Sequence, residues 1–511
     1  MPTPHRLLPL LATLLVVPVA PAAEPAPAAA HPSTLSLRDA LGVTLEHSPA
    51  LRVHKSVIEQ KSGLLEQASG ACDWTGTAGL SLARDRTPVP GLPGTEPVNR
   101  TDSAAYSVGL THLFRSGVYL RPSVNIGVDE NISPASPTYG ASQLSVEIVV
   151  PLLRGLGRDS TGAAEAAARG DIEVARLLYQ HALSSQAFAT AADYWACRRA
   201  DDTLAVQRDV EQAAERLVES TQVLVKSGVF PPAFLLQAEA NLRDKRTVRI
   251  NAELEAHHAR FALGQSLGLS PEAIAATPAP ADPFPRLAES LAPFAPETRQ
   301  NLIVRALQHR ADYRASQQSL VPLNLLARQA ERDLKPEVNL SAATGYKGLH
   351  AGTAPLAPLG HRLTGLNAEV GVSIAWPFRN SYQRGLLRER RAQQDQAEAE
   401  TVQLAQGVAG EVLLALEQLR LRADTVRSAF ETVDIAKRAV AAQYDQLKTG
   451  DGTILDVITL ENLYSSARIS YISAHASYAI ALAQLRYALG DIFDDTAATI
   501  TLADLTTIPA L

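Results

Sequence analysis

The sequence is poor in aromatic residues, methionine and cysteine. Phe, Tyr and Trp together make up 5% of its 511 residues, and there is one Met. Aromatic side chains normally dominate the energetics of protein cores, so this composition argues against the three or four ordinary globular domains that the length alone suggests. The apolar content of 46% is carried by Ala, Leu and Val instead. Because Ala and Leu favour helices and small residues let helices approach closely, we expect long, tightly packed helices.

Other absences exclude several classes of site. The only cysteines, Cys72 and Cys197, make neither a zinc ribbon nor a disulfide framework. We expect no bridge between them, because about 40 residues of predicted helix separate them by ~60 Å. The adjacent His257 and His258 do not share a helix face, and no HExxH pattern occurs, so we expect no metal or other cofactor. A net charge of −6 excludes a strongly basic nucleic-acid-binding protein.

The N-terminus has the pattern of an export signal. His5 and Arg6 precede an apolar stretch that ends in small residues, which predicts a secretory signal peptide over residues 1–23. A Pro/Ala-rich flexible segment is expected to follow at 24–34. No later run of 18 apolar residues predicts a membrane-spanning helix.

The chain contains an internal duplication. Residues 226–268 and 448–490 align without gaps, and two further pairs of segments match in the same order. We therefore divide the chain as follows: a first repeat at 35–268, a Pro-rich linker at 269–295, a second repeat at 296–490 and a C-terminal tail at 491–511.

Each repeat is predicted to contain one very long helix. Apolar residues recur at alternating spacings of three and four from Val402 to Leu447, interrupted only by Lys437. A spacing kept over that length indicates a coiled coil. The helices expected at about 160–226 and 382–448 would each span ~100 Å, far more than a globular domain. A shorter helix precedes the strand region of each repeat (about 36–70 and 297–334), and another ends it (about 233–268 and 454–490).

Strands of a membrane type are predicted between these helices, at 74–152 and 337–378. From Leu366 to Trp376 apolar residues alternate strictly with mostly polar or small ones. Such alternation over about ten residues is typical of a transmembrane barrel, although a half-buried soluble sheet would give it too. Three aromatic residues near strand ends suit a membrane-interface girdle, namely Tyr346, Trp376 and Phe378. Open sheet edges are not tolerated in lipid, so we expect several copies of the chain to share one barrel.

The order and spacing of these segments resemble the TolC-like outer-membrane efflux factors. The likeness covers roughly residues 35–490 and is carried by Leu35–Leu41 with Ser48–Leu51, by Val150–Gly155, by Gly450–Asp456, and by Tyr471–Ala474 leading to Tyr478 and Leu489-Gly490. It implies a mainly α fold with a membrane β part. In this fold three chains share a coiled-coil α-barrel across the periplasm and a twelve-stranded β-barrel in the outer membrane of a Gram-negative bacterium, with four strands from each chain.

The resemblance also implies a function and partners. The homotrimer would be the passive exit duct of a tripartite efflux or type I secretion system, in contact with outer-membrane lipid. A periplasmic adaptor protein and an inner-membrane pump of RND or ABC type would dock on its lower end. The cargo, small toxic compounds or proteins, stays open.

Two features depart from the family pattern. The first repeat holds four candidate strands rather than two, so residues 105–129 would form an extra hairpin, although Pro122 argues against a regular central strand there. The family's acidic gate positions fall on Asp456, Thr459 and Phe234, of which one is acidic. We therefore hypothesise that an apolar ring at Phe234 forms part of the closure. Asp456 also fits a capping box that begins at Thr453.

The tips of the two long hairpins are marked by glycines that follow a lysine. A glycine after a basic last turn is a helix C-cap signal, which plain turns between helices would also show. The family resemblance implies that these tips contact the adaptor protein. The residues concerned are Lys226, Gly228, Lys448, Gly450 and Asp451.

Two alternatives stay open at this point. A coiled-coil envelope scaffold would show the same helices without forming a channel. A serine hydrolase is suggested by the elbow-like pattern from Gly264 through Ser266 to Gly268, but that motif requires a strand–turn–helix context and here it ends a predicted helix. We expect no enzymatic activity.

Overall fold

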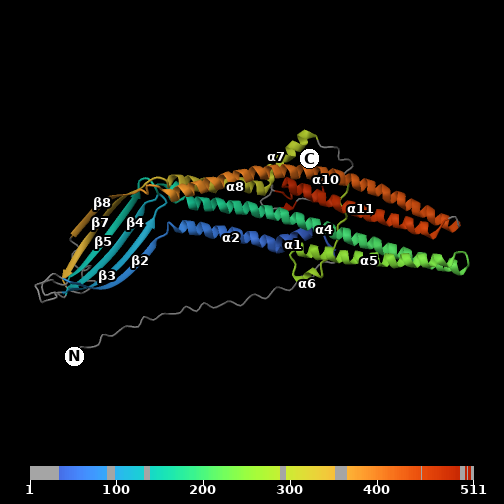
Figure 1. Ribbon diagram of the computed structural model, residues 1–511, viewed down its shortest axis with the longest axis horizontal. Helices are drawn as coiled ribbons and strands as arrows, with labels where there is room; N and C mark the ends of the chain where they lie inside the picture. Colours follow the sequence, from blue (N-terminus) through green and yellow to red (C-terminus); the bar gives the residue numbers. More distant parts are fainter. Residues whose placement is uncertain are drawn as a thin grey trace, which may run out of the picture.

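The computed structural model describes residues 34–88, 98–131, 139–287, 295–351, 365–449, 452–494, 501–502 and 505–507. The predicted signal peptide and nearly all of the flexible segment after it lie outside these residues. The described chain is a long helical rod with a β-sheet at one end and two helical hairpin tips at the other (Figure 1).

Two long helical hairpins form most of the rod. The first consists of α4 (Ala163–Lys226) and α5 (Pro232–Ser266), and the second of α10 (Ser381–Thr449) and α11 (Ile454–Leu489). The 64 residues of α4 and the 69 residues of α10 correspond to about 96 and 104 Å of helix. The predicted long helices are therefore confirmed, with ends within three residues of those expected.

The helix that opens each repeat is broken in two, where the sequence predicts one. The first repeat has α1 (Leu37–His47) and α2 (Pro49–Gly70), because a residue that precedes proline is disfavoured in the helical region and Ser48 is extended. The second repeat has α7 (Pro296–His309) and α8 (Ala311–Arg332), with Arg310 extended although no proline follows it.

Tertiary packing accounts for both breaks. Gly268 and Gly490 have φ of +75° and +77°, and each lies directly against the backbone of the break in its own repeat. A Cβ on Gly490 would lie 3.0 Å from the backbone nitrogen of Arg310, and one on Gly268 would lie 2.8 Å from the carbonyl oxygen of His47. The last helix of each repeat thus ends on the kink of its first helix.

One antiparallel sheet of six strands caps the rod. The first repeat supplies β2 (Thr75–Pro88), β3 (Val98–Leu113), β4 (Tyr119–Asn131) and β5 (Tyr139–Pro151), and the second supplies β7 (Glu337–Ala351) and β8 (Gly365–Ala375). Neighbours in the sheet follow the order β2-β3-β4-β5-β7-β8. The strands are confirmed in both predicted regions. The sheet has six strands rather than the four that the resemblance implies, because the extra hairpin predicted near residues 105–129 lies inside it as β3 and β4.

Pro122 lies within a central strand, contrary to the sequence interpretation. It stands opposite Val146 in the β4–β5 ladder, which runs without interruption from Tyr119 to Asp129. The β3–β4 ladder, in contrast, is interrupted between the pairs Gly109–Ser123 and His112–Leu120. Because proline has no N–H, the missing donor weakens pairing on the β3 side alone, and the other ladder carries the strand through.

Small elements surround the middle of the rod. β1 (Thr34–Leu35) pairs in parallel with β6 (Ala279–Pro280), and β9 (Phe493–Asp494) pairs with β10 (Thr501–Leu502). Two single-turn helices are α3 (Arg158–Thr161) at the sheet exit and α6 (Pro271–Ile274). β6 and α6 lie in the predicted Pro-rich linker. Beneath these elements the fully buried Tyr194 donates its hydroxyl to the carbonyl oxygen of Leu35 at 3.0 Å.

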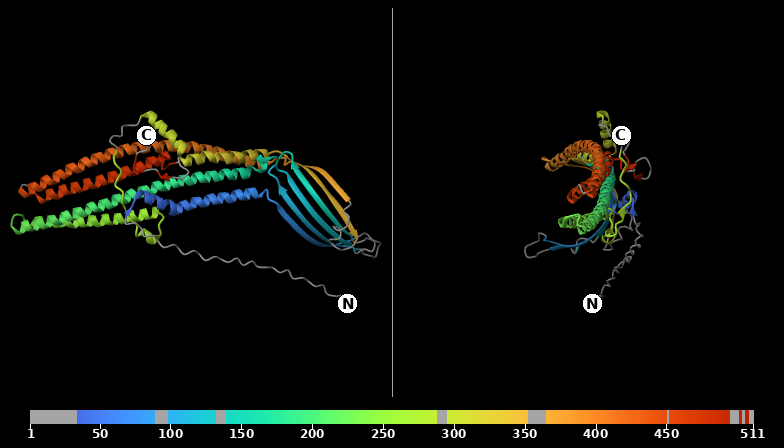
Figure 2. Two further views of the ribbon diagram at one scale, coloured as in Figure 1. Left: turned by 180° about the vertical axis from the view of Figure 1, so that it is seen from behind. Right: turned by 90° about the vertical axis from the view of Figure 1, so that its right-hand side faces the viewer.

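The helices lie side by side in a curved layer (Figure 2). Toward the hairpin tips their order is α5, α4, α11, α10, and toward the sheet it is α2, α4, α8, α10. The predicted heptad seam of α10 is confirmed from Val412 to Val426, where its residues are buried against α11 and α7. On either side of this stretch Val402 and Phe430 are exposed, as expected when a straight α-helix drifts by ~20° per heptad relative to a strict seven-residue repeat.

Candidate functional site

The two faces of the sheet differ in polarity along its whole width. Residues directly opposite one another across the ladders point to the same side, so each row of paired residues identifies one face. One such row, taken in sheet order, is entirely apolar: Ala78, Val108, Val124, Leu144, Tyr346 and Leu366. The next row, on the opposite face, is polar or glycine: Thr77, Gly109, Ser123, Ser145, Gly345 and Asn367.

The apolar face is largely open to the surroundings of the single chain. The side chains of Leu82, Val108, Leu366 and Val370 are all exposed, whereas Ile126 and Val128 near the far end of β4 are buried. Exposed apolar patches of this extent are rare on monomeric soluble proteins and indicate an interaction surface or contact with a membrane.

Aromatic residues lie at the end of the sheet that joins the rod. Trp376 and Phe378 follow β8 directly, and their side chains are 64% and 99% exposed. Tyr346 lies within β7, nearer the other end of the apolar face. The sequence interpretation missed Trp74 and Phe114, which flank β2 and β3 at the rod end and both contact the ring of His112. The position of Trp74 immediately before a predicted strand was the available signal.

The polar face forms a shallow groove. Side chains from all six strands line it: Thr77, Thr111, Ser123, Gln143, Ser341 and Glu369. Two contacts cross from β4 to β5 within it, an ion pair between Arg121 and Glu147 at 3.6 Å and a hydrogen bond between the hydroxyls of Ser123 and Ser145 at 3.0 Å. A polar surface facing away from an apolar one is what the wall of a water-filled membrane barrel requires.

The tip of the first hairpin is a glycine C-cap. Lys226 is the last residue of α4, and Gly228 has φ +77° with open space around the position of a Cβ. The amides of Val229 and Phe230 both donate to the carbonyl oxygen of Leu224, which closes the helix end. At the second tip Lys448 is the penultimate residue of α10, while Gly450 and Asp451 lie outside the described residues.

The three predicted gate residues lie near these tips in different environments. Asp456 forms the predicted capping box: its backbone N–H donates to the hydroxyl of Thr453 at 3.2 Å, and its carboxylate accepts from the Thr453 hydroxyl and amide. Hydrogen bonds from the hydroxyl and then the amide of Thr453 hold the pKa of Asp456 below its usual value. The exposed Thr459 donates its hydroxyl to the carbonyl oxygen of Leu455 at 2.7 Å. Phe234 is half-buried.

An apolar cluster surrounds Phe234. Its ring meets that of Phe230 edge to face, with centroids 5.4 Å apart. Both rings pack against Ile454 and Ile458 on α11 and Leu217 on α4. The cluster therefore joins the first hairpin to the second close to their tips.

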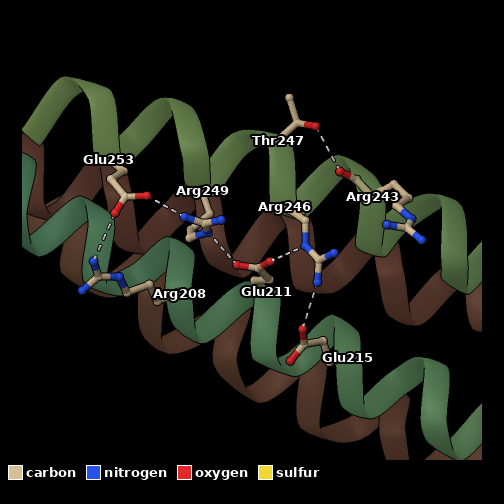
Figure 3. A network of polar contacts seen from close by, with 8 residues as sticks. All are labelled: Arg208, Glu211, Glu215, Arg243, Arg246, Thr247, Arg249 and Glu253. Atoms are coloured by element: carbon tan, nitrogen blue, oxygen red, sulfur yellow. Dashed lines mark hydrogen bonds and ion pairs between the residues drawn. The ribbon is translucent and has the colours of Figure 1, made fainter.

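Ion pairs connect the two helices of the first hairpin over residues 208–253 (Figure 3). Glu211 on α4 accepts from both Arg246 at 3.0 Å and Arg249 at 2.8 Å on α5. The hydrogen bond from Arg246 is the main reason that the pKa of Glu211 lies below its ordinary value. Arg249 also bonds to Glu253 at 2.6 Å, so the pairs form a connected network. In the second hairpin the aligned positions carry Val433, Arg468 and Tyr471, and Arg468 pairs with Asp209 of the first hairpin at 3.0 Å.

A buried cation lies at the break between α7 and α8. The Arg310 guanidinium bonds to Asp312 at 2.6 Å and to Glu411 on α10, and it stands over the ring of Tyr487 at 5.6 Å. Burial alone would raise the pKa of Asp312, but the hydrogen bonds and charge of Arg310 outweigh burial and lower it. His181 on α4 is 3.8 Å from the same carboxylate, and burial lowers its pKa. This network links both repeats at mid-rod.

The hydrolase alternative has no suitable geometry around Ser266. This residue ends α5, a 35-residue helix, and its hydroxyl donates to the carbonyl oxygen of Leu263 at 2.9 Å. A nucleophile elbow needs a turn between a strand and a helix. Both cysteines are free, and burial raises the pKa of Cys197 to about 12. Within the described ranges, no helix is both long and apolar enough to cross a membrane.

Comparison with known proteins places this architecture. The family described as "Outer membrane efflux protein" matches residues 302–491. No curated protein sequence matches the chain.

Several solved structures share the fold over most of the chain. The Campylobacter jejuni CmeC outer membrane channel has a TM-score of 0.69 at 16% identity, covering 90% of this chain and 87% of CmeC. The outer membrane protein VceC from Vibrio cholerae has 0.65 at 16% identity, covering 89% and 96%. The outer-membrane channel OprN has 0.67 at 19% identity, covering 89% and 90%. The chain therefore has the fold of the TolC-like outer-membrane channels, and its residues 302–491 match the outer membrane efflux protein family.

Proposed function

We propose that three copies of the chain form the passive exit duct of a tripartite efflux or type I secretion system in the outer membrane of a Gram-negative bacterium. One observation carries this proposal: a single chain joins an amphipathic, open-edged sheet to a helical rod of about 100 Å. The sheet suits a membrane wall, and the rod suits a passage through the periplasm.

The sheet edges favour a closed assembly. β2 and β8 each pair on one side only within the described part of the chain. Each edge therefore presents unpaired N–H and C=O groups, which cost several kcal/mol apiece in hydrocarbon. Pairing β8 of one copy with β2 of the next would satisfy them all around a ring.

The outer helices of the rod favour the same assembly. Toward the tips the layer ends in α5 on one side and α10 on the other. Both helices carry exposed apolar residues at coiled-coil spacings: Leu236, Ile250, Leu254 and Phe261 on α5, and Leu414, Leu421 and Ile435 on α10. Two complementary unpartnered edges produce a ring when the rotation closes. The family resemblance supports the number three.

The site residues take roles within this duct. Trp376, Phe378 and Tyr346 would lie at the two membrane interfaces. The first tip (Lys226, Gly228) and the second tip (Lys448, Gly450, Asp451) would contact a periplasmic adaptor protein, which in turn engages an inner-membrane pump of RND or ABC type. Asp456, Thr459 and Phe234 would line the closure at the tip, where three copies of an acidic residue favour cations. The inner-membrane pump would select the cargo, which is either small toxic compounds or proteins.

Conductance measurements on reconstituted protein test the proposal. Purified full-length protein should run as a trimer before heating and should form channels in planar bilayers. Leu421→Glu should prevent trimer formation, because it places a charge in the proposed contact between copies, whereas the size-matched Leu421→Met should assemble normally. A stable protein that neither trimerises nor conducts would instead be the envelope scaffold, and the channel proposal would be wrong.

A further inference from the structure

We infer that the β3–β4 hairpin is a part of the barrel wall, so that each copy contributes six strands and three copies close an eighteen-stranded barrel. This inference rests on the proposed trimeric channel and adds its dimensions. The family resemblance implies four strands per chain and twelve in total, so the difference concerns this chain in particular.

The hydrogen-bond ladders place the hairpin in the wall. β3 pairs with β2 from Val98 to Thr111, and β4 pairs with β5 from Tyr119 to Asp129. A hairpin folded over the sheet, or away from it, would leave β2 paired directly with β5. In the structure the hairpin separates these two strands completely, since the sheet order is β2-β3-β4-β5.

The side chains of the hairpin continue both faces of the sheet. Val108 on β3 and Val124 on β4 belong to the unbroken apolar row that runs from Ala78 to Leu366. Their neighbours Ser107 and Ser123 belong to polar or small-residue rows on the opposite face. A hairpin inside the water-filled lumen would expose its apolar face to water, and one outside the wall would expose its polar face to lipid. The alternation fits only a strand pair with lipid on one side and water on the other.

The connections allow the insertion without disturbing the rod. β2 leaves the rod at Thr75 and β5 returns to it at Pro151, while the hairpin is entered after Pro88 and left after Asn131, both at the far end. The tight turn between β3 and β4, at residues 114–118, lies at the rod end, where the amide of Gly157 donates to the carbonyl oxygen of Ser116 at 2.9 Å. An even number of strands also keeps β8 antiparallel to β2 of the next copy.

The strand number determines the width of the barrel. With strands ~4.8 Å apart and tilted by about 40°, eighteen strands give a backbone diameter of about 36 Å, against about 24 Å for twelve. Barrels of sixteen to eighteen strands enclose an open aqueous channel. The exit in the outer membrane would thus be wide, and the helical tips would be the narrow part of the duct.

Cysteine accessibility in the reconstituted trimer tests the inference. In a Cys72→Ser, Cys197→Ala background, Ser107→Cys and Ser123→Cys should react with a charged, membrane-impermeant maleimide. Val108→Cys and Val124→Cys should react at least tenfold more slowly in lipid vesicles.

A matched pair on a strand outside the hairpin provides the control. Gln143→Cys and Leu144→Cys on β5 should show the same contrast, whatever the hairpin does. If that contrast is present but the hairpin pairs react alike, the hairpin lies outside the wall and the inference is wrong while the channel stands. If the β5 pair shows no contrast and the protein does not conduct, the proposed channel fails and the inference fails with it.

Imaging of the trimer in nanodiscs provides an independent count. Eighteen strands around the barrel would agree with the inference, and twelve strands with a separate hairpin would overturn it. This readout does not depend on how freely the substituted cysteines react.

Discussion

Replacing Arg310 by methionine should destabilise the middle of the rod strongly. The guanidinium side chain is 5% exposed, and its partner Asp312 is 12% exposed. Methionine fills a similar volume but leaves the Asp312 carboxylate with His181 at 3.8 Å and the amide of Tyr313 at 2.9 Å as its remaining contacts. A carboxylate would then stay buried without its cation.

The magnitude follows from the exposure of each partner. Removing one member of a buried ion pair costs about 3–5 kcal/mol. The second partner, Glu411, is 54% exposed, so its pair adds no more than ~1 kcal/mol. The lost contact with the Tyr487 ring, at 5.6 Å, adds a further ~0.5–1 kcal/mol. We expect a loss of about 5 kcal/mol in the free energy of unfolding.

Urea unfolding followed by the fluorescence of the buried Trp195 would measure this loss. The double variant Arg310→Met/Asp312→Asn should recover at least half of it, because no unpaired charge is then buried. In Arg310→Met the pKa of Asp312 should rise above its ordinary value, because the hydrogen bonds and charge of Arg310 no longer oppose burial and only the weaker effects of His181 and the Tyr313 amide remain. The folded state then binds the proton more tightly, so the deficit relative to the native protein should shrink as the pH falls from 7 to 5.

Two results would refute this reasoning. A loss below about 1 kcal/mol would mean that the pair contributes no more than an exposed one. A double variant no more stable than Arg310→Met would mean that packing, rather than the uncompensated carboxylate, accounts for the cost.

Three further predictions concern the tip and the core. Gly228→Ala should lower the free energy of unfolding by roughly 1–2 kcal/mol, because φ is +77° there. Gly63→Ala, in mid-helix with open space around it, should raise it by ~0.5–1 kcal/mol. Equal shifts of the melting temperature in the two variants would contradict the left-handed cap. Burial lowers the pKa of His475, so as the pH falls this side chain is protonated more readily in the unfolded chain than in the folded one. Stability should therefore fall as the pH drops below ~6.5. His475→Phe should reduce that fall in urea titrations at pH 5–7. Phe234→Ala should raise channel conductance by loosening the contact between hairpins, and unchanged single-channel currents would rule out a role for this ring in closure.

Sequence patterns predicted the helical rod well, because long amphipathic helices leave a strong periodic signal. The breaks in the opening helices show where this signal ends. Ser48 is followed by a proline, so a local cue existed. No such local cue exists at Arg310. Its extended backbone is held by contacts with Glu411 and Gly490, which lie far from it in the sequence.

The sequence located the strands but did not show that the extra hairpin belongs to the same sheet. Alternation located the strands, yet Pro122 suggested that the extra hairpin was irregular. A proline's missing donor affects only one of the two ladders, and single-sequence reasoning could not tell which ladder would carry β4. Among the site residues, the capping box at Thr453 and Asp456 was legible because it is local, whereas the packing of Phe234 against α11 depends on how the two hairpins meet.

The ion-pair network of the first hairpin makes the two repeats physically unequal. Dissolved salt screens the contacts of Glu211 with Arg246 and Arg249. At the aligned height of the second hairpin, Phe430 on α10 instead meets the ring of Tyr471 on α11, a contact that does not depend on charge. Raising the ionic strength should therefore loosen the helix pairing of the first hairpin more than that of the second. The two hairpins thus share a shape, but the stability of the first depends on salt concentration more than that of the second.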